Sequence, residues 1–211
     1  MNKNVKILFG KPGAGKGTRL GALASVDRFE LISVGNLLRT AVKNGTELGQ
    51  KAKSYMDSGA MVPDDIINNI VIEGIMSSTK PVVTDGFPRT VGQAKAMLEA
   101  GIIPDMVIVL DVDDEVVVER SKDRIVCPDC GTPYTLNDFN PPKVQGICDK
   151  CGAHLVKRKD DEEAVVRNRL AVFSTETLPV LDVLSEAGVT IHTIDNTAKD
   201  AGEKFAELMN S

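Results

Sequence analysis

The chain contains no tryptophan, and aromatic residues make up only 4% of its 211 residues. It also has no excess of positive charge, because 30 Asp and Glu residues outnumber 25 Lys and Arg residues and leave a formal net charge of -5. Proteins that bind single-stranded nucleic acid place aromatic side chains among basic ones, and polyanion binders are usually basic overall. We therefore expect no nucleic-acid partner, although a local basic cleft is compatible with this composition.

Long apolar runs are also missing, since none approaches the roughly 20 residues that a membrane-spanning helix needs. Residues 1–4 lead directly into a strand-like segment, with no apolar signal segment before it. We therefore expect no membrane partner and a cytoplasmic location. In that compartment the four cysteines stay reduced, so disulfide bonds are the less favoured use for them.

The apolar residues that are present, 42% of the chain, fit one globular domain with small insertions. Runs rich in Val and Ile predict buried strands at residues 5–9, 29–33, 81–85, 106–111 and 189–194. Helical patterns occupy residues 18–24, 37–42, 64–76, 94–99, 115–124, 163–186 and 199–209. This alternation is typical of an α/β fold, with a parallel sheet covered on both faces and ligands at the carboxyl ends of its strands. Residues 126–159 lack periodicity and are predicted to be an insertion.

A glycine-rich segment, GKPGAGKGT at residues 10–18, follows the first predicted strand. Its glycines let backbone N–H groups converge on phosphate oxygens, and the next helix adds its positive N-terminal end. Lys16 supplies a cation for the β- and γ-phosphates. The general motif has Ser or Thr directly after the lysine. Here Gly17 intervenes before Thr18, as in nucleoside monophosphate kinases. A turn without function is the alternative, but the flanking strand and helix favour a nucleotide site.

Several arginines stand beside predicted loops or at the edges of the insertion. Phosphoryl transfer between two nucleotides requires cations that neutralise the transferring group. The segment DGFPR at residues 85–89 places Asp85 and Arg89 at the carboxyl end of the third strand. Arg124 is the fourth residue after Arg120 on one predicted helix, which puts the two on one face. The set is completed by Arg158, at the end of the insertion, and Arg169, on the following helix.

One neighbouring arginine does not fit this set. Arg167 lies two residues before Arg169, about 200° around a helix, so the two side chains point in nearly opposite directions. Glu163 precedes Arg167 by four residues, in the favourable order for a surface ion pair. We therefore expect Arg167 to be a solvated ion-pair partner.

The insertion contains two Cys-x-x-Cys pairs, Cys127 with Cys130 and Cys148 with Cys151. This spacing matches a tetrahedral structural zinc site with Zn–S bonds of about 2.3 Å. Four thiolates leave no open coordination position, so we expect the metal to be structural. Iron or cobalt can occupy the same ligands, and two disulfides are the competing interpretation. His154 offers a further nitrogen ligand, but a solvated loop histidine is the favoured interpretation.

In combination these motifs resemble the adenylate kinases of the bacterial type with an extended lid, over nearly the whole chain. The resemblance is carried by residues 10–18, 33–39, 57–62, 85–93, Arg120 with Arg124, and residues 158–169. It implies a P-loop NTPase-type fold in a single domain over residues 1–211, with a five-stranded parallel core. It further implies an AMP-binding insertion at residues 33–62 and a zinc-ribbon-like, metal-binding lid at residues 123–161. The implied reaction is reversible, Mg²⁺-dependent phosphoryl transfer from ATP to AMP, giving two ADP, by a monomer that maintains adenine nucleotide levels.

The resemblance also implies a role for individual residues. The residues implied to bind ATP are Gly13, Ala14, Gly15, Lys16, Gly17, Thr18, Arg120, Arg124, Tyr134 and Ala198. Those implied to bind AMP are Val34, Arg39, Ala60, Met61, Val62, Gly86, Phe87, Pro88, Arg89, Gln93, Arg158 and Arg169. The implied catalytic residues are Lys16, Arg89, Arg124, Arg158 and Arg169, and Asp85 organises the water shell of Mg²⁺. The structural Zn²⁺ is assigned to Cys127, Cys130, Cys148 and Cys151.

Four residues depart from the family pattern. Val34 replaces a Thr near the AMP base, Asn36 replaces an Asp that assists Mg²⁺, Ile125 replaces an arginine, and Asp123 replaces a hinge Gly. Base choice depends on few contacts, so a kinase for UMP, CMP or GMP is the alternative enzyme. A zinc-ribbon nucleic-acid-binding module is the alternative from a different class, suggested by the cysteine pairs.

Overall fold

A computed structural model describes residues 4–23, 28–58, 60–136 and 140–211. Its main sheet has five parallel strands in the order β2-β3-β1-β4-β7. Their bounds are β1 (Val5–Phe9), β2 (Glu30–Ser33), β3 (Val82–Asp85), β4 (Met106–Asp111) and β7 (Thr190–Asp195). The strands expected from the sequence are confirmed, with ends shifted by at most one residue. Strand β1 lies at the centre, so the glycine-rich loop that follows it emerges in the middle of the sheet.

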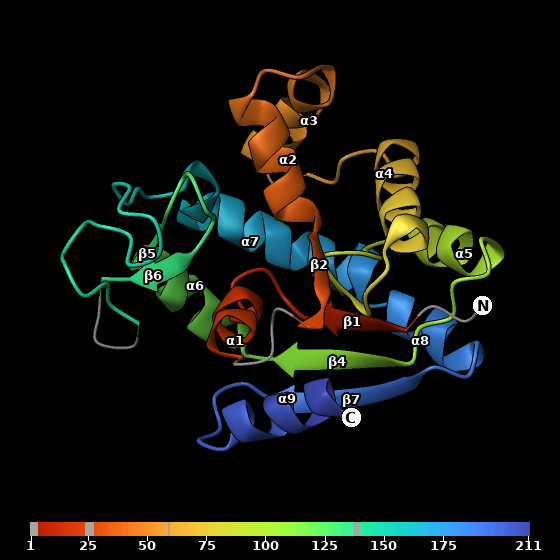
Figure 1. Ribbon diagram of the computed structural model, residues 1–211. Coiled ribbons are helices and arrows are strands. Elements are labelled where there is room, and N and C mark those ends of the chain that lie inside the picture. The colour runs from red at the N-terminus through yellow and green to blue at the C-terminus, as the bar shows by residue number, and fades with distance from the viewer. Residues whose placement is uncertain (1–3, 24–27, 59, 137–139) are drawn as a thin grey trace.

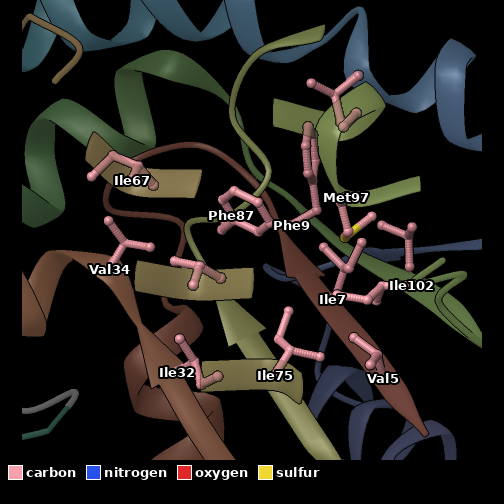
Figure 2. Close-up of a cluster of buried hydrophobic side chains, with 14 of the residues drawn as sticks. Val5, Ile7, Phe9, Ile32, Val34, Ile67, Ile75, Phe87, Met97 and Ile102 are labelled. Carbon is pink, nitrogen blue, oxygen red and sulfur yellow. The ribbon is translucent and has the colours of Figure 1, made fainter. Parts of the chain in front are cut away.

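Helices cover both faces of this sheet, because alternate strand residues point to opposite sides. On one face Val5, Ile7 and Phe9 pack with α4 (Asp64–Ser77), α5 (Val91–Glu99) and α8 (Val180–Glu186). Figure 2 shows these three side chains of β1 together with Ile75 of α4 and Met97 of α5. On the other face the strands pack with α1 (Lys16–Ala22), α6 (Asp114–Lys122), α7 (Glu163–Val172) and α9 (Ala201–Asn210). The result is the predicted α/β architecture.

A lysine inside β1 is an exception to the apolar pattern. Lys6 is buried, and its Nζ donates hydrogen bonds to the carbonyl oxygens of Leu208 at 2.9 Å and Met209 at 3.0 Å. These carbonyls belong to the last turn of α9, where backbone acceptors lack partners within the helix and positive charge is favourable. The buried lysine therefore ties the C-terminal helix to the central strand.

Two segments project from the core (Figure 1). The first follows β2 and consists of α2 (Val34–Lys43) and α3 (Glu47–Ser58). The second follows α6 and contains the antiparallel pair β5 (Arg124–Val126) and β6 (Pro133–Thr135), then the short turn η2 (Lys159–Asp161). Its small core combines Ile125, Tyr134, Cys127 and Cys148 with the flanking Ala153 and Leu155. The first segment lies within residues 33–62 and the second within residues 123–161, and the roles expected for these two ranges stay predictions.

Two of the predicted helices are wrong in extent. Helix α6 ends at Lys122, so Arg124 begins β5 and does not share a helix with Arg120. Strand formation prevails there because Ile125 and Val126 pair with Tyr134 and Pro133, and β-branched side chains favour strands. The long helix predicted at residues 163–186 is interrupted between α7 and α8 by a π-helical turn, η3 (Phe173–Thr177), and by Pro179. Proline cannot donate a helical hydrogen bond, which accounts for the break.

Part of the predicted pattern falls outside the described residues, namely Ala24 at the end of the first predicted helix, residue 59 and residues 137–139. In the described ranges, no helix combines the length and the apolarity needed to cross a bilayer.

Candidate active site

A cleft of about 330 Å³ opens at the carboxyl ends of the sheet strands, between the core and the two projecting segments. Its size is typical of a small-ligand site. Every residue assigned to ATP, AMP or Mg²⁺ by sequence lines this cleft, apart from Ala14 and Ala198. Ala14 is fully buried behind the loop, and Ala198 lies in the turn after β7. The structure thus brings together residues that are spread over most of the chain.

The glycine-rich loop wraps around the ammonium group of Lys16, the first residue of α1. Lys16 Nζ donates to the carbonyl oxygens of Gly10 at 2.7 Å and Lys11 at 3.0 Å. Burial lowers the pKa of Lys16 to about 8, against the attraction of Asp85, and the nearby charges of Arg89, Arg169 and Arg124 add to the lowering. A lysine with so many cationic neighbours marks a site built for an anion.

Two aspartates of η2 hold the arginines that face the loop. Arg158 Nε donates to Asp160 at 2.8 Å, and Arg169 Nη1 donates to the other oxygen of the same carboxylate at 2.7 Å. Arg124 pairs with Asp161 through two hydrogen bonds, of which the Nε bond measures 2.9 Å. These aspartates hold the three guanidinium groups in place over the cleft.

The charges in this cluster shift one another's pKa values. Burial alone raises the pKa of Asp160, but Arg158, Arg169 and Arg124 outweigh it and hold that pKa well below its usual range. Burial lowers the pKa of Arg169 to about 9. The negative charge of Asp160 opposes this lowering, and the positive charge of Arg158 adds to it. Neither Asp160 nor Asp161 was assigned to the site from sequence, although two adjacent acids that start two residues after Arg158 were a visible signal.

The segment α2 and the turn after β3 supply further cations. Arg39 Nη2 donates to Asn36 at 2.5 Å, and burial with the nearby charge of Arg158 lowers the pKa of Arg39 to about 10. The Arg89 side chain folds back over Gly86, where an added Cβ would lie 2.5 Å from Arg89 Nη2. Gly86 also has a φ of +81°, so this turn requires glycine both for space and for its backbone conformation.

Asp85, the last residue of β3, lies at the floor of the cleft. Its carboxylate accepts a hydrogen bond from the Ser33 hydroxyl at 3.1 Å, at the end of the neighbouring strand. Carboxylate, hydroxyl and water oxygens are the ligands that Mg²⁺ prefers. The residues present here therefore fit a hydrated magnesium ion bound together with phosphates.

The part of the cleft beside α2 has an apolar wall. Val34 and Phe87 both line the cleft and belong to the main hydrophobic cluster, where Figure 2 shows them near Ile67. Gln93 is buried: its Nε2 donates to Asp64 at 2.8 Å, and its Oε1 accepts from the Arg89 backbone at 2.7 Å. The predicted contact between Gln93 and the AMP base stays a prediction, as does a base contact for Tyr134. The Tyr134 hydroxyl accepts from the Asp149 backbone at 2.8 Å, within the second projecting segment.

Arg167 lies outside the cleft, as expected. It forms ion pairs with Glu163 at 2.9 Å and with Glu115 at 3.0 Å, and all three side chains are largely exposed. The interpretation of Arg167 as a solvated ion-pair partner is confirmed.

The four cysteines converge at the tip of the second projecting segment. Their Sγ atoms all lie within 4.8 Å of one another, with Cys127 and Cys151 separated by 3.4 Å and Cys130 and Cys148 by 3.5 Å. A tetrahedron with metal–sulfur bonds of about 2.3 Å has edges of about 3.8 Å. A disulfide bond has an S–S length of about 2.05 Å, and all four cysteines are free. The residues present therefore fit one tetrahedral metal ion.

The backbone repeats one turn at both cysteine pairs. Gly131 N donates to the Cys127 carbonyl at 3.0 Å, and Gly152 N donates to the Cys148 carbonyl at 2.9 Å. The pairs also resemble each other in burial, because Cys127 and Cys148 are buried whereas the second cysteine of each pair is exposed. Two matching turns of this kind are typical of a zinc ribbon.

Comparisons with known proteins agree with this geometry. The sequence profile described as "Adenylate kinase" matches residues 8–189. The chain is 43% identical over 211 residues to an adenylate kinase of Carboxydothermus hydrogenoformans, with 97% of each chain covered. It is 44% identical over 208 residues to one of Oceanobacillus iheyensis, covering 96% of this chain and 95% of the relative. An adenylate kinase of the archaeon Methanosarcina barkeri is 42% identical over 210 residues, with 96% and 95% covered. The chain belongs to the adenylate kinase family.

Proposed function

We propose that this chain catalyses the reversible transfer of a phosphoryl group from ATP to AMP, giving two ADP. The observation that carries the proposal is the convergence on one cleft of a phosphate-binding loop and of arginines from both projecting segments, the β3 turn and α7. A single nucleotide does not need so many separate cations, whereas two anionic nucleotides brought together do. The family membership of the chain supports the same reaction.

The positions of the cations suggest a division of labour. The loop around Lys16 holds the donor phosphates, with backbone N–H groups at the start of α1. Arg39 and Arg89, beside the apolar wall of Val34 and Phe87, hold the phosphate of the acceptor. Arg124, Arg158 and Arg169 lie between these two groups in the charge network and neutralise the transferring phosphoryl group.

The pairing of arginines with Asp160 and Asp161 prepares the site before substrate arrives. Each guanidinium is already held at a fixed place in the cleft by its aspartate, and its remaining N–H groups are available to donate to phosphate. Closing the second projecting segment over the substrates excludes water, which strengthens these interactions and protects the phosphoryl group from hydrolysis. This segment therefore acts as a lid.

Magnesium bound with ATP would supply charge neutralisation for the phosphates. Asp85 and Ser33 are the residues that would hold its water shell. Asn36 also lines the cleft, but its side chain is an amide whose oxygen accepts a hydrogen bond from Arg39, so it adds no carboxylate to this shell.

We assign the four cysteines to a structural Zn²⁺ that stabilises the lid. The lid buries few apolar side chains, so metal binding supplies folding free energy that packing alone does not.

A monomer in the cytoplasm is the expected setting for the enzyme, as the resemblance implies.

A screen of acceptors tests the proposal. MgATP is supplied at a fixed concentration, and ADP formation is followed with AMP, CMP, GMP and UMP in turn. We expect AMP to give the highest kcat/KM by at least roughly tenfold, the effect of one base-specific hydrogen bond. Equal or faster turnover of another monophosphate would assign the chain to a different specificity. Tight binding of single-stranded DNA at low salt would instead favour the nucleic-acid module.

A further inference from the structure

Asn196 has a buried side chain beside the phosphate loop, and the proposed function above gives this residue no role. Asn196 follows β7 and is 6% exposed. Its Nδ2 donates to the Ala14 carbonyl oxygen at 2.5 Å, and its Oδ1 accepts from Arg19 Nε at 2.6 Å. Its backbone carbonyl accepts from Arg120 Nη2 at 3.4 Å, and its backbone N–H donates to Asp111 at 2.9 Å. One residue thus connects the loop, two arginines and the neighbouring strand.

The contact with Ala14 bears directly on the shape of the phosphate loop. Ala14 and Gly15 are the last two residues before Lys16. An added Cβ at Gly15 would lie 2.8 Å from Asn196 Nδ2, so the amide packs against the loop as well as bonding to it. A fixed carbonyl at Ala14 fixes the peptide plane that carries the Gly15 N–H group, because a peptide unit is planar. The Asn196 amide thereby orients a potential phosphate donor of the loop.

The contact with Arg19 extends this network to a second part of the cleft. Arg19 and Arg120 both line the cleft, and burial lowers the pKa of each, with the charge of Arg19 adding to the effect on Arg120. These two cations meet at Asn196, whereas Arg158 and Arg169 meet at Asp160. Since the phosphoryl group is transferred at the Asp160 group, the nucleoside of the donor must extend away from it, toward Arg19 and Arg120.

We propose that Asn196 is a positioning residue for the donor nucleotide. Its amide sets the phosphate loop through Ala14 and, through Arg19 and Arg120, the guanidinium groups that lie along the donor nucleoside. The inference rests on the proposed function in one respect, namely that the donor is MgATP. Its consequence is selective: loss of the amide weakens the donor site and leaves the acceptor site, with Arg39 and Arg89, unaffected.

Calorimetric titration of the full-length protein tests this assignment with two probes, MgATP and inorganic tripolyphosphate, which lacks a nucleoside. In Asn196→Ala we expect the dissociation constants of both probes to rise roughly tenfold, the effect of one lost hydrogen bond to a buried group. In Arg19→Ala we expect the dissociation constant of MgATP to rise roughly tenfold and that of tripolyphosphate to change less than twofold. The double variant is expected to lose less MgATP affinity than the sum of the single variants, because the two residues act through one contact.

Two further variants separate positioning from simple loss of packing. Asn196→Asp keeps an acceptor for Arg19 but places a carboxylate oxygen against the Ala14 carbonyl, so we expect tripolyphosphate binding to weaken as in Asn196→Ala. Lowering the pH protonates that carboxylate and restores a donor, so the ratio of variant to wild-type affinity is expected to recover toward acid pH. Asn69→Ala on the exposed side of α4 and Arg167→Ala on the surface serve as controls.

The outcomes distinguish this inference from the proposed function. Steady-state kinetics of Asn196→Ala is expected to show a raised KM for ATP and an unchanged KM for AMP. Wild-type affinity for tripolyphosphate in Asn196→Ala and Asn196→Asp would overturn the positioning role while leaving the kinase assignment intact. Equal rises in both KM values would overturn it as well. A wild-type protein that binds no MgATP would overturn the proposed function itself.

Discussion

Burial and neighbouring like charges destabilise the charged form of side chains in this cleft, and the negative charge of a substrate would offset that cost. Lys16 keeps its charge among Arg89, Arg124 and Arg169, and its pKa falls to about 8 because burial and these neighbours disfavour the ammonium form. A triphosphate brings negative charge to the same place and favours that form again. Binding energy at this residue therefore depends on charge more than on shape.

Replacing Lys16 by Met tests the role of this charge. We expect kcat to fall by ~10²–10³, the effect of removing one charge aimed at the transferring group. The melting temperature is expected to change little, because the variant also removes a buried charge whose folded-state pKa is depressed. Near-normal turnover with an unchanged melting curve would show that Lys16 has no part in the chemistry.

The depressed pKa of Lys16 also predicts how ATP binding depends on pH. Bound phosphates favour the protonated lysine, so above pH 8 binding requires uptake of a proton and the affinity for MgATP should fall as pH rises, by up to roughly tenfold per pH unit. Calorimetry between pH 7 and 10 checks this, with Lys16→Met expected to show a flatter profile. An affinity for the wild type that is constant across this range would contradict the assigned ionisation.

The same depressed pKa of Lys16 affects folding stability with the opposite dependence on pH. The unfolded chain binds the Lys16 proton more tightly than the folded chain, so below pH 8 the charged lysine carries a constant cost in stability. Between pH 8 and the ordinary lysine pKa of 10.5 the folded chain releases this proton first, and the contribution of Lys16 to stability rises with pH.

Arg89 provides a test of the division between acceptor and donor. Arg89→Ala is expected to raise the KM for AMP by tenfold or more and to change the KM for ATP less, because a guanidinium–phosphate contact is a charge-assisted, bidentate interaction. Kinetics with each nucleotide varied in turn measures both constants, with Arg167→Ala as a surface control. An equal rise in both constants would argue against separate sites.

At the scale of elements, local patterns were predictable from sequence and long-range partners were not. The strands and the loop at residues 10–18 were predictable because consecutive residues show the pattern, namely runs rich in Val and Ile for the strands and closely spaced glycines for the loop. Helix α3 was missed because only Gly49 and Ala52 are buried along it, which leaves a weak apolar face. Asp160 and Asn196 were missed for another reason: their partners, Arg169 and Ala14, are set by the tertiary fold. Arg124 was placed on the wrong element because its helix stops at Lys122, where pairing with β6 prevails.

The proposed metal site at the cysteine cluster would give the lid its own source of stability. Removal of the metal by chelation, or Cys148→Ser, is expected to lower the melting temperature and to speed proteolysis between residues 126 and 159, while the sheet remains folded. We expect enzyme activity measured at low temperature to be largely kept when the melting temperature falls, because no thiolate lines the cleft. Elemental analysis and melting curves before and after chelation measure both effects. A protein without bound metal, or one that keeps its fold and loses all activity at low temperature, would contradict a structural role.

The whole molecule can be understood as a rigid sheet that carries two projecting segments around one charged cleft. The core supplies Lys16 and Asp85, α2 supplies Arg39, and the lid supplies Arg124 and Arg158. In the proposed reaction the cations come from the core and from both projecting segments, so we expect the site to be complete only when these parts meet. The proposed closure of the lid would then link catalysis to the exclusion of water, because the same movement completes the site and covers it.

The most direct test of this account follows all phosphorus species at once when the wild-type protein is mixed with MgATP and AMP. Phosphorus NMR resolves ATP, AMP, ADP and inorganic phosphate in one experiment. The account predicts that ATP and AMP disappear in equal amounts and that two ADP appear for each pair, with no accumulation of inorganic phosphate. Release of inorganic phosphate in step with ATP loss, with AMP unchanged, would show transfer to water and would contradict the central claim.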